Sequence, residues 1–167
     1  AKGRVVMEFG SRRAQGADGA ILGARAAYIA GAAATACAIV DREYGVPAIG
    51  TMAHSWVQMF PSEEDAFRAY AQTYPDNCTL LVDTYNVLQS GIPNAIKIFS
   101  EEVVSRGYRP KGVRIDSGDI AYLSKKVRKL LDAAGFEDCK IMASNSLDEY
   151  IIQEILKQDG KVDSFGV

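Results

Sequence analysis

Histidine, tryptophan and cysteine are scarce in this chain of 167 residues, and each scarcity excludes a class of site. There is one histidine, His54, and one tryptophan, so a histidine-rich metal site is excluded. The three cysteines, Cys37, Cys78 and Cys139, are odd in number and form no CxxC pair, which argues against a disulfide framework and a zinc site. A reducing compartment suits this pattern best, and we expect a cytoplasmic protein.

Long apolar runs and a strong net charge are also missing. The uncharged, alanine-rich run of residues 26–40 is too short and too broken by glycine and alanine to span a bilayer, which takes about 20 apolar residues. The first residues carry no secretory signal pattern. A net charge of −2 gives no general attraction to nucleic acid or anionic membranes. We therefore expect neither partner, and we expect residues 1–167 to form a single globular domain.

Several sequence motifs of common active sites are absent. The chain has no GxxxxGK[ST] phosphate loop, no GxSxG elbow and no HExxH pair, and the glycines of residues 16–23 do not match GxGxxG. Because the net charge is also small, any anion-binding groups must be local.

Short apolar runs alternate with stretches of helical periodicity along the whole chain. The expected strands are residues 5–9, 47–50, 79–83, 112–116, 140–143 and 162–167, with a very short strand also possible within residues 32–40. The first expected helix runs from Asp18 to about Gly31, a second ends at Tyr44, and a third begins after a Ser62 cap. A fourth runs from Pro93 to about Ser105, with Val103 and Val104 in the core. The last two run from Asp119 to about Gly135 and from Leu147 to Lys157. Unbroken Val/Ile/Leu strands joined by helices imply parallel pairing. We predict an α/β fold with a closed or partly closed parallel (β/α) barrel-like core, rather than an open Rossmann sheet.

Polar side chains follow most of the expected strands. They are Arg12 and Arg13, Thr51 and His54, Asp83 and Thr84, Asp116 and Asp119, and Ser144 and Asn145. The carboxyl ends of parallel strands collect at one edge, so we expect these side chains to converge. Arg114 joins them if it faces the interior, because an arginine buried there needs a carboxylate or a ligand as partner.

Each polar group has a chemical interpretation and a plainer alternative. Arginine suits phosphate or carboxylate, and Asp116 with Asp119 suits magnesium or sugar hydroxyls. Alternatively, Arg12 and Arg13 lie on a solvated turn, residues 116–119 only cap a helix, and His54 is a satisfied histidine at the edge of the core.

Five motifs taken together resemble one enzyme family. They are Glu8-Phe9-Gly10-Ser11-Arg12-Arg13-Ala14-Gln15-Gly16, Gly50-Thr51-Met52-Ala53-His54-Ser55-Trp56, Leu81-Val82-Asp83-Thr84-Tyr85, Gly112-Val113-Arg114-Ile115-Asp116-Ser117-Gly118-Asp119 and Ala143-Ser144-Asn145. In this order they resemble the nicotinate phosphoribosyltransferases, and the resemblance spans almost the whole chain. It implies the barrel core of a type II phosphoribosyltransferase.

The resemblance implies an ATP-coupled reaction of NAD salvage. Nicotinate and phosphoribosyl pyrophosphate would give nicotinate mononucleotide and pyrophosphate, and His54 would carry a phosphoryl group from ATP. An imidazole nitrogen is a competent nucleophile near neutral pH, which suits this role.

The resemblance also implies roles for individual residues. Phe9 and Arg114 would sandwich or orient the pyridine ring, Thr51 would lie near its carboxylate, and Arg12 would hold phosphate. Asp116, which we assign with His54 as catalytic, would bind ribose hydroxyls or the Mg²⁺ that accompanies pyrophosphate. The remaining substrate-binding positions are Arg13 as an accessory anion contact, Ser55, Asp119, Ser144 and Asn145.

Nicotinate is expected rather than nicotinamide. The related nicotinamide enzyme has an aspartate beside the amide, in a segment that aligns with residues 31–35, and this chain has no acid there. Alternatives are a nicotinamide or quinolinate phosphoribosyltransferase, or an inactive barrel core that binds phosphorylated ligands. By the resemblance, we expect a piece of a longer chain that lacks an N-terminal domain and a C-terminal Gly-Thr phosphate-binding turn, and that forms its sites in a homodimer.

Overall fold

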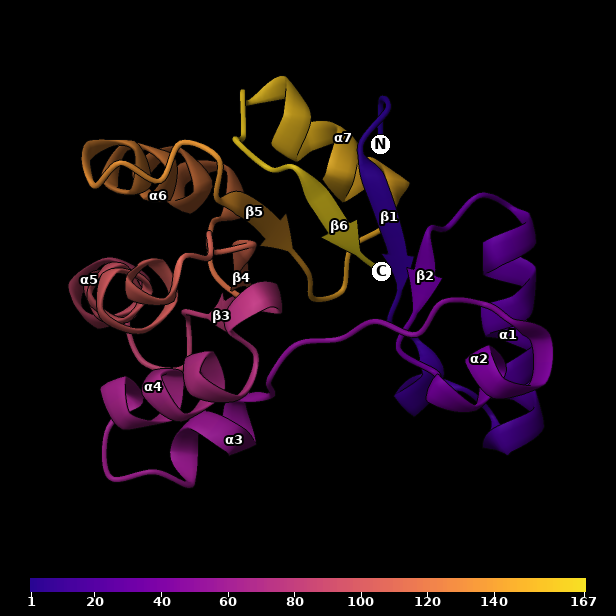
Figure 1. Ribbon diagram of the computed structural model, residues 1–167. Helices are drawn as coiled ribbons and strands as arrows, with labels where there is room; N and C mark the ends of the chain where they lie inside the picture. The colour runs from indigo at the N-terminus through magenta and orange to yellow at the C-terminus, as the bar shows by residue number, and fades with distance from the viewer.

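The computed structural model describes residues 1–167 and contains one sheet of six parallel strands. The strands are β1 (Val5–Glu8), β2 (Ala34–Thr35), β3 (Thr79–Leu81), β4 (Gly112–Ile115), β5 (Lys140–Ala143) and β6 (Ser164–Gly166). Their order is β2-β1-β6-β5-β4-β3, and the sheet curls in space (Figure 1). Strands that are consecutive in sequence lie side by side, and β6 lies beside β1. The one exception is β2 and β3, which do not pair and form the two free edges. This is the order of a barrel opened between β2 and β3, so the predicted incomplete parallel barrel is confirmed.

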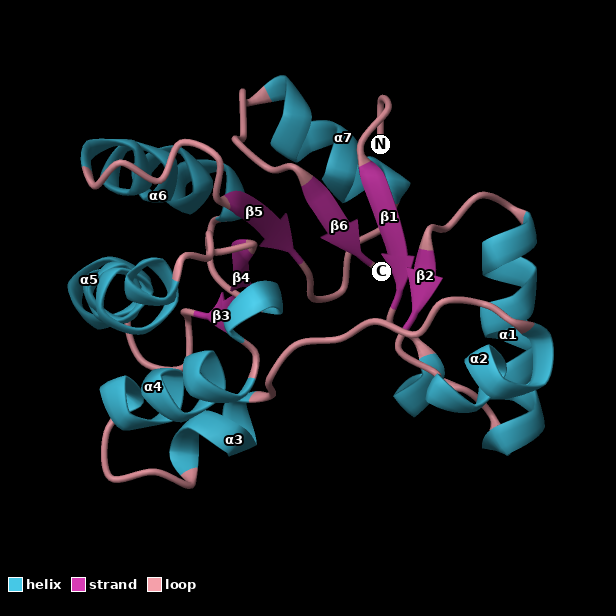
Figure 2. Cartoon of the chain, in the orientation of Figure 1, coloured by secondary structure: helices cyan, strands magenta, loops and turns pink.

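The helices α1 to α7 flank the sheet (Figure 2). They are α1 (Gly16–Ile29), α2 (Ala38–Tyr44), α3 (His54–Gln58), α4 (Glu63–Thr73), α5 (Ile92–Ile98), α6 (Ile120–Ala133) and α7 (Glu149–Lys157), with 3₁₀ turns at Ser11–Arg13, Pro75–Asn77 and Val104–Arg106. The first two lie beside the β1–β2 edge, and α3, α4 and α5 lie toward the β3 edge (Figure 1). None of these helices is long and apolar enough to cross a membrane.

The main hydrophobic core lies between the strands β3 to β6 and the helices that cover them. Leu80, Val113, Ile141 and Phe165 are fully buried there, in one cluster of 28 buried residues. A second, smaller cluster of four residues holds α1 and α2 together. The apolar strands therefore form a rigid base for the loops that follow them.

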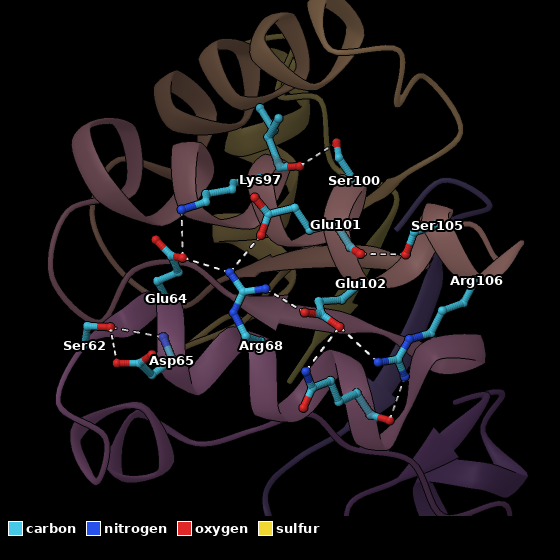
Figure 3. Close-up of polar contacts among 12 residues, drawn as sticks. Ser62, Glu64, Asp65, Arg68, Lys97, Ser100, Glu101, Glu102, Ser105 and Arg106 are labelled. Carbon is cyan, nitrogen blue, oxygen red and sulfur yellow. Dashed lines mark hydrogen bonds and ion pairs between the residues drawn. The ribbon is translucent and has the colours of Figure 1, made fainter.

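Helix α4 begins where the sequence predicts, because the Ser62 hydroxyl accepts a hydrogen bond from the Asp65 amide at 3.1 Å. On its outer side, Arg68 donates to three carboxylates, those of Glu64 (2.9 Å), Glu101 (2.7 Å) and Glu102 (2.6 Å) (Figure 3). These bonds raise the pKa of the Arg68 guanidinium. The network ties α4 to the segment after α5, although each surface ion pair adds little stability by itself.

The strand predicted at residues 47–50 is wrong. Only Ala48 forms a bridge, to Thr35 of β2, and Ile49 is 41% exposed. Pro47 has no N–H to donate. The segment crosses from α2 to α3 below the open side of the sheet (Figure 1), where no further strand pairs with it.

The helix predicted from Pro93 to Ser105 begins earlier and is less regular than expected. π-helical turns at Val87–Gly91 and Phe99–Val103 flank α5. The Asn86 side chain caps the first turn by accepting from the amides of Leu88 (3.1 Å) and Gln89 (2.9 Å). Val104, predicted to lie in the core, is 39% exposed because the helix tightens into a 3₁₀ turn there. Helix α1 also begins before the predicted Asp18 cap, at Gly16.

Candidate active site

The polar side chains gather at the carboxyl ends of the strands, around a cavity of about 300 Å³. Its lining consists of Phe9, Arg12, Ala36, Gly50, Thr51, Met52, Ala53, His54, Leu81, Arg114 and Asp116. The residues come from the ends of β1, β2, β3 and β4 and from the segment that crosses the open side. A cavity of this size, with an apolar wall and a few convergent polar groups, is typical of a small-molecule site.

Arg114 is the central cation of the cavity. Its Nε donates to the Ser144 hydroxyl at 2.7 Å, one Nη to Thr51 at 2.9 Å and the other to Asp116 at 3.0 Å. Its guanidinium carbon also lies 5.6 Å from the centre of the Phe9 ring. The side chain therefore faces the interior and has the carboxylate partner that the sequence requires.

His54 begins the short helix α3 and faces two carboxylates. Its Nε2 lies 3.4 Å from an Asp116 oxygen and 4.0 Å from an Asp83 oxygen, and its Nδ1 lies 3.1 Å from the Thr84 hydroxyl. Carboxylates only accept hydrogen bonds when ionised, so they favour the tautomer with the proton on Nε2. The Nδ1 lone pair then accepts from Thr84. The His54 side chain is 40% exposed, so the imidazole is open to the solvent of the cavity.

Asp83 is the part of the site to which sequence reasoning gave no role. Its side chain is only 1% exposed. One oxygen accepts from the Asp116 amide at 3.0 Å and from the Ser117 hydroxyl at 2.5 Å. The other oxygen, next to His54, is buried and has no hydrogen-bond partner. Asp83 thus holds the start of the loop after β4 and presents a second negative charge to the imidazole.

Asp116 joins the histidine and the arginine. Its first oxygen accepts from Arg114 and from the Ser144 hydroxyl, and its second faces His54. Partial burial raises the pKa of this carboxyl, but the bonds from Ser144 and Arg114 outweigh it and leave the pKa below its usual value. Asp116 is therefore an anion at neutral pH.

A second cavity, of about 250 Å³, adjoins the first and shares Phe9, Arg12, Arg114 and Asp116 with it. Its further lining is Gly10, Arg13, Ser144, Asn145, Ser146, Leu147, Gly166 and Val167. Asn145 and Ser146 have positive φ angles of 83° and 30°, so the backbone turns sharply at this side of the cavity. Arg12, Arg13 and Arg114 make the second cavity the more cationic end of the site.

Two predicted substrate-binding residues lie apart from both cavities. Ser55 is exposed in the first turn of α3. Asp119 is exposed and caps α6 by accepting from the Tyr122 amide at 2.9 Å. For Asp119 the alternative of simple helix capping therefore describes the observed contact. The other predicted site residues line at least one of the two cavities.

The sequence of this chain is similar to those of known proteins. The model of the nicotinate phosphoribosyltransferase family matches residues 5–167. The chain belongs to this family. Its sequence is 47% identical over 163 residues to a nicotinate phosphoribosyltransferase of Bacillus subtilis (strain 168), covering 98% of this chain and 33% of that protein. It is 46% identical over its whole length to a nicotinate phosphoribosyltransferase of Mycobacterium tuberculosis, of which it covers 35%.

Two solved structures share the fold. The human nicotinic acid phosphoribosyltransferase superposes with a TM-score of 0.90 at 28% identity, over 98% of this chain and 43% of that chain. A nicotinate-nucleotide pyrophosphorylase from Pyrococcus furiosus superposes with a TM-score of 0.80 at 26% identity, over 99% of this chain and 42% of that chain. The chain thus spans about a third of the length of the sequence relatives described above.

Proposed function

We propose that the protein containing this chain is a nicotinate phosphoribosyltransferase that transfers phosphoribosyl to nicotinate in NAD salvage, with ATP hydrolysis coupled to the transfer. The observation that carries the proposal is the sharing of one carboxylate. Asp116 lies between the imidazole of His54 and the guanidinium of Arg114, so a nucleophile and an anion-binding group meet in one cavity. Membership of the family supplies the reaction class.

Nicotinate fits the first cavity better than nicotinamide. Arg12 and Arg114 supply positive charge there, and Ala36, the residue that follows β2, adds no acid to the lining. The nearby carboxylate of Glu8 is turned away, because it accepts from the Thr35 hydroxyl and the Gly10 amide. An arginine fork binds a carboxylate well.

The ring of the substrate would lie beside Phe9 rather than between Phe9 and Arg114. A sandwiched ring would need about 7 Å, since stacked carbon atoms sit about 3.5 Å apart. The guanidinium lies only 5.6 Å from the centre of the Phe9 ring. We propose that Phe9 packs against the pyridine and that Arg114 orients its carboxylate, with the hydroxyl of Thr51 as a neighbour.

Phosphoribosyl pyrophosphate would occupy both cavities, with its phosphates toward Arg12, Arg13 and the turn at Asn145. The pyridine nitrogen attacks the ribose C1, the bond from C1 to pyrophosphate breaks, and positive charge develops at C1 in the transition state. Asp116 is the anion placed to stabilise that charge.

His54 would accept the γ-phosphoryl group of ATP on Nδ1. A P–N bond forms as the bond to the β-phosphate oxygen breaks, and ADP leaves. Thr84 would turn its hydroxyl away from Nδ1, while Asp83 and Asp116 would stabilise the positive charge that the imidazole gains. Attack of water on the phosphohistidine later releases phosphate and restores the ring.

Mg²⁺ is proposed to enter with pyrophosphate rather than to sit in a protein site. No group of three or more histidine, cysteine or acidic side chains is arranged so that it could hold a metal ion. Both oxygens of Asp116 are already engaged by Arg114, Ser144 and His54. An ion bound to pyrophosphate needs few protein ligands. The proposed transfer therefore does not require a magnesium site built from protein side chains.

We also propose that the protein is located in the cytoplasm and that it forms a homodimer. All three cysteines are free and buried, which suits a reducing compartment. The dimer rests on the family resemblance alone.

The proposed reaction is tested by comparing acceptors. With protein expressed from the complete coding sequence, kcat/KM for nicotinate is expected to exceed that for nicotinamide and for quinolinate, and turnover is expected to be stimulated by ATP. The release of pyrophosphate and the formation of the mononucleotide are measured for each acceptor. Preference for the amide or for quinolinate would overturn the assignment, and binding of phosphorylated ligands without turnover would favour an inactive barrel core.

Replacing Arg114 with lysine is expected to raise the KM for nicotinate about 10- to 100-fold, because the donors of an ammonium all lie on one atom and do not reproduce the planar fork that reaches Ser144, Thr51 and Asp116. Steady-state kinetics with nicotinate as the varied substrate provide the measurement. Arg109→Lys is the matched control, since that exposed arginine also makes several bonds, to Asp138 and to a backbone carbonyl. An unchanged KM in the Arg114 variant would contradict the assigned role.

A further inference from the structure

Gly166, the last residue of β6, lies directly against the ring of Phe9. A Cβ built on Gly166 would lie 2.5 Å from the Cε2 atom of Phe9, closer still to Cδ2, and 3.3 Å from Cγ. Real Cβ atoms do not approach other atoms this closely. The ring therefore occupies the space that any other residue at position 166 would fill with its side chain.

The backbone does not explain this glycine. Seven other glycines of the chain have positive φ angles, and Gly166 is not among them. A Cβ on Gly112 would meet the backbone of Lys140, and one on Gly160 would meet the side chain and backbone of Ile155. At Gly166 the three nearest atoms all belong to the Phe9 ring, which lines both cavities of the site.

The two strands cannot separate to make room. Hydrogen bonds flank Gly166 on the β1–β6 pair: the Phe9 amide donates to the Val167 carbonyl at 2.5 Å, and the Val167 amide donates to the Met7 carbonyl at 2.9 Å. A methyl group at position 166 must therefore be relieved by the Phe9 side chain. To reach ordinary van der Waals contact, the ring must move by about 1 Å.

We propose that Gly166 is a positioning residue that sets where the Phe9 ring stands, and through it the width of the pocket for the pyridine ring. Resting on the proposed function, this role makes the absence of a side chain at position 166 a determinant of nicotinate binding. The ring is held on one side by β6 and has the Arg114 guanidinium over its face. Displacement away from β6 thus changes the wall of the cavity and the contact with Arg114 together.

The decisive substitution is Gly166→Ala, in protein expressed from the complete coding sequence. Its KM for nicotinate is expected to rise about tenfold or more, which is the usual effect of one methyl group in a tight pocket. ATP-dependent labelling of His54 is expected to persist, because His54 lies on α3 and not on β1 or β6. Gly160→Ala is the control for crowding alone, since Gly160 lies in the loop before β6 and away from both cavities.

A double-mutant cycle tests whether the rise of the KM for nicotinate in Gly166→Ala is caused by displacement of the Phe9 ring. In a Phe9→Ala background the added Gly166→Ala change is expected to alter the KM less than twofold, because the ring that the methyl group displaces is absent. An equal rise of KM in both backgrounds would overturn the proposal. If Gly166→Ala does not fold, the double variant should fold; failure of both would overturn the proposal as well.

A crystal structure of Gly166→Ala gives a readout that does not depend on turnover. The Phe9 ring is expected to be displaced by about 1 Å or more from its place beside β6. A ring in its original position would refute the positioning role. Absence of nicotinate turnover in the unsubstituted protein would instead refute the proposed function, and the position of the ring would still decide the role of Gly166.

Discussion

ATP-dependent phosphorylation of the protein is expected to disappear when His54 is replaced by alanine. His54 is the only imidazole in the chain. Its Nδ1 faces the Thr84 hydroxyl, while its Nε2 faces two carboxylates. These contacts leave Nδ1 as the nucleophilic nitrogen. Incubation with γ-labelled ATP should label the unsubstituted protein with an acid-labile phosphate. The stimulation of nicotinate turnover by ATP should vanish together with the label.

The labelling experiment needs a control for damage to the short helix that His54 begins. Gln58→Ala, on the exposed side at the end of α3, alters the same helix and removes no group that faces the cavity. It should keep the label. Label that survives in His54→Ala would show that another residue carries the phosphoryl group, and the phosphohistidine proposal would then be wrong.

Much of the candidate site could be predicted because parallel strands impose it. Once the strands ending near Phe9, Leu81, Ile115 and Ala143 are identified, their carboxyl ends must lie at one edge of the sheet. The polar residues that follow these strands therefore lie close together. The contacts of Arg114 and His54 with the same carboxylate are the direct result.

The role of Asp83 could not be predicted in this way. The sequence places it after β3, but only the structure shows that its free oxygen lies 4.0 Å from His54 Nε2. The direction in which the Asp83 side chain points depends on hydrogen bonds from the Asp116 amide and the Ser117 hydroxyl. These bonds join residues more than 30 positions apart, and no local pattern records them.

The errors in the fold have local and non-local causes. Asn86 is a good helix cap, so the early start of the helix at Val87 had a signal in the sequence. Residues 47–50 had the composition of a strand, yet their one β-bridge is to Thr35, because the barrel is open at this place. Whether an apolar run becomes a strand depends on the presence of a partner on each side, which a single segment does not encode.

Replacing Asp116 with asparagine is expected to lower kcat by about 10²- to 10³-fold, the usual effect of removing a group that stabilises charge in the transition state. The amide oxygen can still accept from Arg114 and Ser144, so the fold and the binding of nicotinate should be little changed. The negative charge near the ribose C1 is lost. The amide nitrogen would also face His54 Nε2 and disfavour the tautomer that leaves Nδ1 free. Both the transfer and the phosphorylation should slow, as measured by single-turnover kinetics and by the rate of labelling.

The pH dependence distinguishes this role from a simple loss of packing. Because Ser144 and Arg114 hold the pKa of Asp116 below its usual value, the carboxylate stays charged at neutral pH and loses its charge only below about pH 4. The ratio of the unsubstituted kcat to the variant kcat should therefore stay constant between about pH 5 and pH 8. Asp148→Asn is the matched control, because Asp148 only caps α7, where it accepts from the Ile151 amide at 2.8 Å, and asparagine caps a helix equally well. A ratio that grows as the pH rises through 6 to 7 would mean that the carboxyl titrates there, and an unchanged kcat would mean that Asp116 does not act on the transition state.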